Sequence, residues 1–140
     1  MLYNDDLFLD PDIFKKYTML IKLLKGKLHR GTVTDSQLEY PGSIAIDPVL
    51  LDAAGMLPYE KVLIADVDNG NRLETYTVLG KPNSGEISIL GAAAHRIKKG
   101  DTIIIMAFAL CTPQEAADLV PKVVVLDKSN NIVDLPNRKS

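Results

Sequence analysis

The sequence has very little cysteine, no strong excess of either charge and no long hydrophobic run. Cys111 is the only cysteine, which excludes an intrachain disulfide and a metal site of the CxxC type. The formal net charge of −2 offers no general basic surface and disfavours nucleic acid as the main partner. The longest apolar runs, such as 103–111, are too short to cross a bilayer as a helix. We therefore expect a cytoplasmic protein with no membrane partner.

The remaining composition is that of an ordinary globular domain. Apolar residues make up 46% of the chain and charged residues 24%, so a core can form. A length of 140 residues fits a single domain. Residues 1–18 lack the apolar region of a secretory signal, and we expect either a disordered N-terminal extension or sequence upstream of a true start at Met19. The predicted domain is 19–140.

Short strands separated by turns dominate the pattern after this extension. We expect strands over 27–34, 62–65, 75–78, 86–90, 102–110 and 122–126. The polar residues 68–71 between two of them are typical of a β-hairpin turn. The isoleucine-rich run 102–110 predicts a strand that is buried on both faces.

Helices are expected to be few and short. Asp47 can cap a helix over 48–54, and Thr112 can begin another over 113–119 through a capping box. One more turn is expected over 92–97. Many short strands with little helix indicate a small closed barrel, so the predicted fold is mainly β.

The bond between Gly42 and Ser43 is the most informative in the chain. A serine hydroxyl attacks an amide only where the peptide is distorted and the developing oxyanion is stabilised. Glycine reaches strained backbone angles at low cost, and Pro41 restricts Tyr40 to an extended conformation. Taken alone, these four residues are more typical of an ordinary Pro-Gly turn.

Several segments together resemble the aspartate 1-decarboxylase family in residue type, order and spacing. They are Gly26–Arg30, Tyr40 with Gly42 and Ser43, Ala45–Asp47, Leu51–Gly55, Asn69 and Gly70 with Arg72, Thr75 with Tyr76, and Gly91–His95. The resemblance extends over roughly 24–126. It implies a six-stranded double-psi β-barrel with a few short helices, assembled as a homotetramer.

The resemblance also implies that the chain cuts itself between Gly42 and Ser43. An N-to-O acyl shift, elimination and hydrolysis would leave a β chain, 1–42, and an α chain, 43–140, that begins with a pyruvoyl group made from Ser43. This self-generated cofactor forms a Schiff base with L-aspartate and accepts the electrons released as CO2 departs. The product is β-alanine, a precursor of pantothenate and coenzyme A. The need for a maturation factor is left open.

Individual side chains acquire roles from the same resemblance. Tyr76 corresponds to the proton donor, and Thr75 to a residue that contacts the substrate. Arg72 corresponds to a clamp on a substrate carboxylate, a role that suits its planar fork of donors. The other implied positions are the substrate-binding residues Gly91, Ala92, Ala93 and Lys27, and the pocket residues Tyr40 and His29. Without the resemblance, Tyr76 and Thr75 would be ordinary strand residues and Arg72 a solvated charge.

No metal is predicted, because His29 and His95 lack the companion ligands that a metal site requires. Two positions depart from the family pattern. Leu90 replaces an asparagine that usually lies beside the cleavage point, and Pro41 replaces an acidic or aliphatic residue. Both departures bear on how fast the chain is cleaved.

Two alternatives to an enzyme stay open. The first is a barrel that is never cleaved and acts as a binding or regulatory module. The second is a DNA-binding barrel of the swapped-hairpin kind, which the acidic balance of the chain disfavours.

Overall fold

A computed structural model describes residues 19–136, so the predicted extension over 1–18 lies outside the described residues. The elements are β1 (Ile21–Thr32), β2 (Asp35–Gln37), β3 (Ser43–Ile46), α2 (Pro48–Ala53), β4 (Lys61–Asp66), β5 (Arg72–Leu79), β6 (Ile87–Leu90), the 3-10 helix η2 (Gly91–His95), β7 (Thr102–Cys111), α3 (Pro113–Asp118), β8 (Lys122–Leu126) and β9 (Ile132–Asp134). The predicted mainly β fold with short helices is confirmed.

These residues form two compact units. The first contains 19–23 and 109–119, and therefore α3, the N-terminal end of β1 and the C-terminal end of β7. In α3, Thr112 and Glu115 form the predicted capping box. The second unit contains 24–108 and 120–136, which includes every segment of the candidate site.

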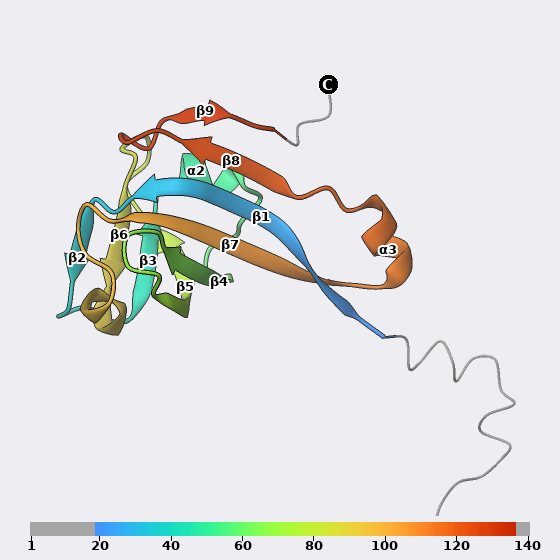
Figure 1. The fold of residues 1–140 in the computed structure, drawn as a ribbon, viewed down its shortest axis with the longest axis horizontal. Helices are drawn as coiled ribbons and strands as arrows, with labels where there is room; N and C mark the ends of the chain where they lie inside the picture. The colour runs from blue at the N-terminus through green and yellow to red at the C-terminus, as the bar shows by residue number, and fades with distance from the viewer. Residues whose placement is uncertain (1–18, 137–140) are drawn as a thin grey trace, which may run out of the picture. The chain divides into compact units, whose positions relative to one another are not determined.

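Strand pairing in the second unit follows the order β2-β6-β3-β5-β4-β7-β1-β8-β9 (Figure 1). The pairs β1–β8, β2–β6 and β3–β5 are parallel, whereas β3–β6, β4–β5, β4–β7 and β8–β9 are antiparallel. Strand β3 is therefore an interior strand, with β6 on one side and β5 on the other. The order ends at β2 and β9, and the closure of six strands into a double-psi barrel stays a prediction.

The core consists of aliphatic side chains from most of these strands. The most deeply buried are Leu28, Val33, Ile44, Ile46, Val62, Ile64, Ile87, Ile89, Ile97, Ile103, Ile105 and Val124. All four residues of β3 are buried, although 43–46 was not expected to be a strand. The serine at the start of β3 is thus fixed by the packing of its aliphatic neighbours.

One expectation about burial is wrong. Strand β7 is not buried on both faces: Ile103 and Ile105 are buried, whereas Ile104 and Met106 are half-buried and Phe108 is exposed. Successive side chains of a strand point to opposite faces, and only one face of β7 is directed into the core of this chain. Apolar character on both faces therefore did not indicate burial on both.

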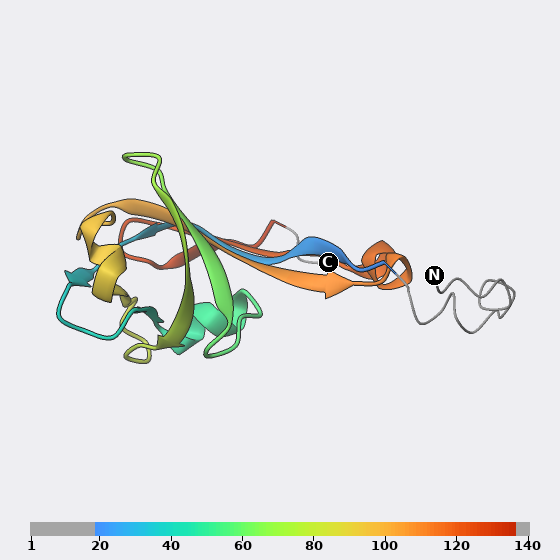
Figure 2. The same cartoon turned by 90° about the horizontal axis from the view of Figure 1, so that it is seen from below.

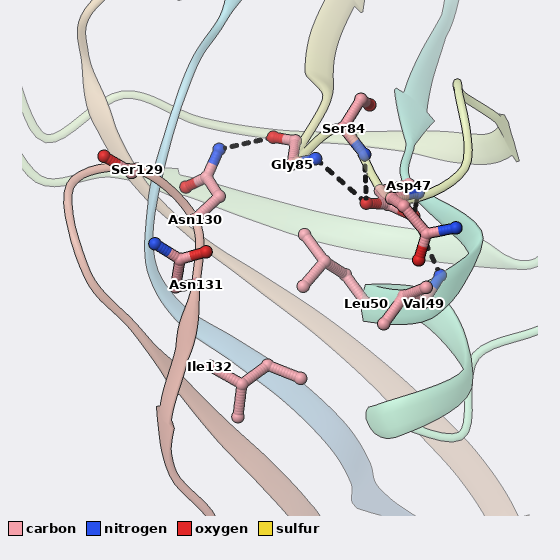
Figure 3. A pocket seen from close by; sticks show the side chains of 10 residues that line it. Asp47, Val49, Leu50, Ser84, Gly85, Ser129, Asn130, Asn131 and Ile132 are labelled. Carbon is pink, nitrogen blue, oxygen red and sulfur yellow. Dashed lines mark hydrogen bonds between the residues drawn. The ribbon is translucent and has the colours of Figure 1, made fainter.

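Asp47 connects the end of β3 to the loop that precedes β6 (Figure 3). Its carboxylate accepts four backbone N–H groups, from Val49 at 3.0 Å, Asn83 at 3.1 Å, Ser84 at 3.0 Å and Gly85 at 2.9 Å. Burial by itself would raise the pKa of Asp47, but these hydrogen bonds hold it below its ordinary value. The predicted N-cap thus also fixes the antiparallel register of β3 and β6.

A pocket of about 290 Å³ lies beside this carboxylate, between α2, the loop 83–85 and the turn 129–132 (Figure 3). Its second polar centre is Asn130, whose amide donates to the carbonyls of Thr32 and Gly85 at 2.9 and 2.7 Å. The Asn130 carbonyl accepts the Thr32 N–H at 2.7 Å. Backbone groups therefore occupy the polar atoms of Asp47 and Asn130, and we assign this pocket a structural role.

Candidate active site

Ser43 is the first residue of β3 and is only 5% exposed. It lies opposite Leu90 in the antiparallel β3–β6 pair. In the parallel β3–β5 pair, Ile44 lies opposite Thr77. Ser43 directly precedes Ile44 and Tyr76 directly precedes Thr77, so Ser43 and Tyr76 lie at the same level of the two strands. The sheet therefore places the predicted nucleophile between the end of β6 and the middle of β5.

Gly91 packs directly against the predicted scissile segment. Its φ is +84°, in the left-handed region that favours glycine. A Cβ at this position would lie 2.6 Å from the Gly42 Cα, 2.8 Å from the Gly42 nitrogen and 2.8 Å from the Tyr40 carbonyl oxygen. No larger residue fits here without displacing the backbone, so the Gly-Ala-Ala-Ala stretch and the Gly42–Ser43 bond form one local structure.

The small residues that follow Gly91 form the short 3-10 helix η2. Leu90 is its N-cap and supplies no side-chain hydrogen bond to the helix. The first N–H groups of a helix have no partner within the helix, so those of η2 remain suited to bind an oxygen. The φ of Gly42 itself lies outside the left-handed region.

Strand β5 presents Arg72 and Tyr76 on one exposed face. The burial of β5 alternates, with Arg72 exposed and Tyr76 40% exposed, whereas Thr75 is half-buried on the other face opposite Val62. Arg72 lies four residues from Tyr76, which corresponds to roughly 13 Å along a strand. Within the described residues, its guanidinium makes no ion pair. Of these three predicted residues, Tyr76 therefore lies nearest to Ser43.

Lys27 and His29 lie on β1, away from the other predicted residues. Strands β5, β4 and β7 separate β1 from β3 in the sheet order. Both side chains are half-buried around the fully buried Leu28, which agrees with their expected position on a common face. Burial lowers the pKa of His29, and the charges of Lys27 and Arg30 lower it further. Its Nδ1 is buried and has no hydrogen-bond partner among the described residues.

Tyr40, the predicted pocket residue, is largely exposed within this chain. Its side chain is 57% exposed, and Pro41 and Gly42 are exposed beside it. Its contribution to the local structure is the backbone carbonyl that faces Gly91. The structure thus brings together Gly42, Ser43, Gly91 and Tyr76. Arg72 lies on the same face of β5 as Tyr76, and Lys27 and His29 lie on β1, which is not next to β3 in the sheet order.

A cluster of three carboxylates was not anticipated from the sequence. One oxygen from each of Asp66, Asp68 and Asp101 lies within 4.8 Å of the others. Each group already accepts a backbone N–H: Asp66 from Asp68 at 2.9 Å, Asp68 from Thr102 at 2.8 Å, and Asp101 from Lys98 at 3.0 Å. We therefore assign the cluster to holding the β4–β5 turn in place.

The Asp66 carboxyl group is 2% exposed, and burial is the main reason that its pKa rises to about 6; the neighbouring Asp101 and Asp68 carboxyls raise it further. The folded chain therefore binds this proton more tightly than the unfolded chain, and stability falls as the pH rises from about 4 to above 6. We expect Asp66→Asn to remove a penalty on the order of 2 kcal/mol at pH 8, with a clearly smaller gain at pH 4.5. Thermal melts at half-unit pH intervals measure the difference.

Asp127→Asn is the matched control for this prediction. Hydrogen bonds, chiefly from Asn131, lower the pKa of Asp127, so that carboxylate is ionised in both states between pH 5 and 8. Its substitution should shift the melting temperature by the same amount across that range. A constant shift for Asp66→Asn as well would contradict the proposed penalty.

None of the helices within 19–136 has the length and apolar character that crossing a bilayer requires. Comparison with known proteins gives a consistent result. The family described as aspartate decarboxylase matches residues 19–133. An aspartate 1-decarboxylase of Clostridium botulinum (strain Loch Maree / Type A3) is 51% identical over 119 residues, which is 85% of this chain and 94% of the relative.

Two further relatives carry the same name. The aspartate 1-decarboxylase of Carboxydothermus hydrogenoformans is 50% identical over 121 residues, 86% of this chain and 95% of the relative. That of Clostridium beijerinckii is 48% identical over 122 residues, 87% of this chain and 98% of the relative. The match covers all of the segments that build the candidate site.

Proposed function

The chain belongs to the aspartate decarboxylase family, and from this premise we propose that it converts L-aspartate to β-alanine and CO2 with a pyruvoyl group made from its own Ser43. The observation that carries the proposal is the close packing of Gly91 on Gly42, next to the pairing of Ser43 with Leu90. This contact joins the bond to be cut to the start of η2, where Leu90 supplies no side-chain cap.

The residues around Ser43 fit the formation of such a group. The Ser43 side chain is buried, which limits competition from water during attack on the Gly42 carbonyl. The N–H groups at the start of η2 are suited to stabilise the oxyanion that the attack creates. Leu90, opposite Ser43, contributes no polar group to this step, so we expect cleavage to be slow.

Substrate handling is then divided among the remaining residues. When formed, the pyruvoyl group supplies a carbonyl that binds the substrate amine and accepts electrons as CO2 leaves. The Tyr76 hydroxyl returns a proton to the carbon that lost CO2, and Arg72 holds a substrate carboxylate through bidentate hydrogen bonds. The N–H groups of Gly91, Ala92 and Ala93 hold a substrate oxygen, and the backbone of Thr75 adjoins Tyr76.

The active form is proposed to be a cytoplasmic homotetramer of cleaved protomers. The separation of Lys27 and His29 from Ser43 within one chain supports this assembly, because a neighbouring copy can supply them to the site. The neighbouring copy would then supply a hydrogen-bond partner for the His29 Nδ1, which has none among the described residues. The free, buried Cys111 agrees with a reducing compartment.

Intact-mass analysis of the purified chain under denaturing conditions tests the proposal, together with CO2 release from L-aspartate. We expect two fragments, 1–42 and 43–140, with the larger lighter by one ammonia than an unmodified peptide of that sequence. A single uncut chain after prolonged warm incubation, without CO2 release, would instead favour the binding or regulatory module. Cleavage that begins only after cell extract is added would identify a maturation factor.

A further inference from the structure

The turn between β4 and β5 is tied to the segment that follows η2. The amide groups of Asn69 and Asn71 both donate to the carbonyl oxygen of Arg96, each at 3.1 Å. Arg96 is the C-cap of η2, and its own N–H donates to the carbonyl of Ala93 at 3.0 Å. Two side chains of one turn therefore hold the residue at which the small-residue helix ends.

This turn is internally rigid. The Asp66 N–H donates to the Asn71 carbonyl and the Gly70 N–H to the Asp66 carbonyl, both at 2.8 Å. The side-chain oxygen of Asn69, Oδ1, accepts a hydrogen bond from the backbone N–H of Asn71 at 2.8 Å. Figure 2 shows the turn at the top of the view, where the two strands of the hairpin meet. Arg72 directly follows Asn71, so these hydrogen bonds fix the backbone of Arg72 relative to Arg96.

We infer that Asn69 and Asn71 are positioning residues that set the spacing between Arg72 and the N–H groups of Gly91–Ala93, and thereby the length of dicarboxylic acid that the site accepts. The inference rests on the proposed function, in which these two groups bind different oxygens of one substrate. Helix η2 reaches Gly42 at its first residue and the Asn69–Asn71 turn at its end. The turn therefore connects Arg72 to the C-terminal end of η2, the end of that helix that lies away from Gly42.

The side chain of Asn71 is the better target for a test, because within 19–136 its one hydrogen bond is that to Arg96. We expect Asn71→Ala to be cleaved like the unmodified chain. Its KM for L-aspartate should rise about three- to tenfold, the effect of losing one side-chain hydrogen bond, with less than a twofold change in kcat. Combining it with Asn69→Ala should give a larger loss than the two single effects together, because in each single variant the remaining amide still holds the shared carbonyl in part.

Dicarboxylic acids of different length give a readout that general destabilisation would not move. Succinate has the four-carbon length of aspartate, and glutarate is one carbon longer. We expect succinate to inhibit the unmodified enzyme more strongly than glutarate, and Asn71→Ala to reduce that ratio by about three- to tenfold. Asn131→Ala is the control, because it removes an equivalent amide donor, to Asp127 at 3.2 Å, from the β8–β9 turn.

The outcomes separate this inference from the function on which it rests. An unmodified chain that neither cleaves nor releases CO2 overturns both. A working enzyme whose succinate-to-glutarate ratio is unchanged by Asn71→Ala and by the double substitution overturns only the positioning role. The same holds if Asn131→Ala alters the ratio equally. A reduced ratio in the Asn71 and double variants alone supports the inference.

Discussion

Ser43→Ala is expected to leave the chain uncut and to abolish CO2 release from L-aspartate. Alanine at this position lacks the hydroxyl that attacks the Gly42 carbonyl, so neither the acyl shift nor the pyruvoyl group can form. Loss of a covalent electron sink removes the whole catalysed pathway rather than a fraction of it. The fold should persist, because Ser43 is a small residue in a strand held by Ile44 and Ile46. Intact mass, CO2 release and a thermal melt together measure the three effects.

Ser88→Ala is the matched control for this substitution. Ser88 is also 5% exposed, lies opposite Ala45 in the same β3–β6 pair, and donates to Glu86 at 2.8 Å. Its replacement should cost about 1 kcal/mol of stability through the lost hydrogen bond and leave both cleavage and CO2 release intact. Decarboxylation by an uncut Ser43→Ala chain would contradict the proposed origin of the cofactor.

Local features of the fold were predictable from the sequence because neighbouring residues determine them. The hairpin forms as predicted, with Ala65 opposite Arg72, since polar turn residues separate two β-forming runs. The helix after Asp47 and the turn over Gly91–His95 likewise follow from caps and small residues. These elements need no information from distant parts of the chain.

Pairings between distant segments were not predictable in the same way. Strand β3 reads as a turn followed by a helix cap, and it becomes a strand because β5 and β6 flank it on both sides. The pairing of Ser43 with Leu90 and the contact of Gly91 with Gly42 both depend on that register. The acidic cluster escaped notice because Asp66 and Asp101 meet only when the turn docks near β7. The resemblance supplied residue roles, and the tertiary structure relates them in space.

Asn69 and Thr75 also have surroundings that depend on the tertiary structure. Asn69 lies in a segment that the resemblance includes, yet its interaction with Arg96 becomes visible only in the folded chain. Thr75 was expected to contact the substrate together with Tyr76, but the alternation of β5 directs the two side chains to opposite faces. Adjacent side chains of a strand face opposite sides, so the predicted contact of Thr75 with the substrate stays a prediction.

Tyr76→Phe is expected to separate maturation from turnover. Phenylalanine keeps the aromatic ring and removes only the hydroxyl, so packing beside the start of β3 should be preserved. Cleavage between Gly42 and Ser43 depends on other groups and should proceed normally. Loss of a general acid in the decarboxylation step should lower kcat by about 10²- to 10⁴-fold, with a smaller change in KM. Intact mass and steady-state CO2 release on the same sample measure both parts.

Tyr59→Phe is the control that makes this result specific. Tyr59 is the other exposed tyrosine next to β5, and its N–H donates to the Thr77 carbonyl at 2.8 Å. Tyr59 has no role in the proposed site, so the loss of its hydroxyl should leave turnover within a factor of about two. An unimpaired kcat for Tyr76→Phe would reject the proton-donor role, because Tyr76 is the tyrosine that the β3–β5 register places level with Ser43. Reduced turnover with complete cleavage, confined to Tyr76, would show that the exposed face of β5 carries the protonation step.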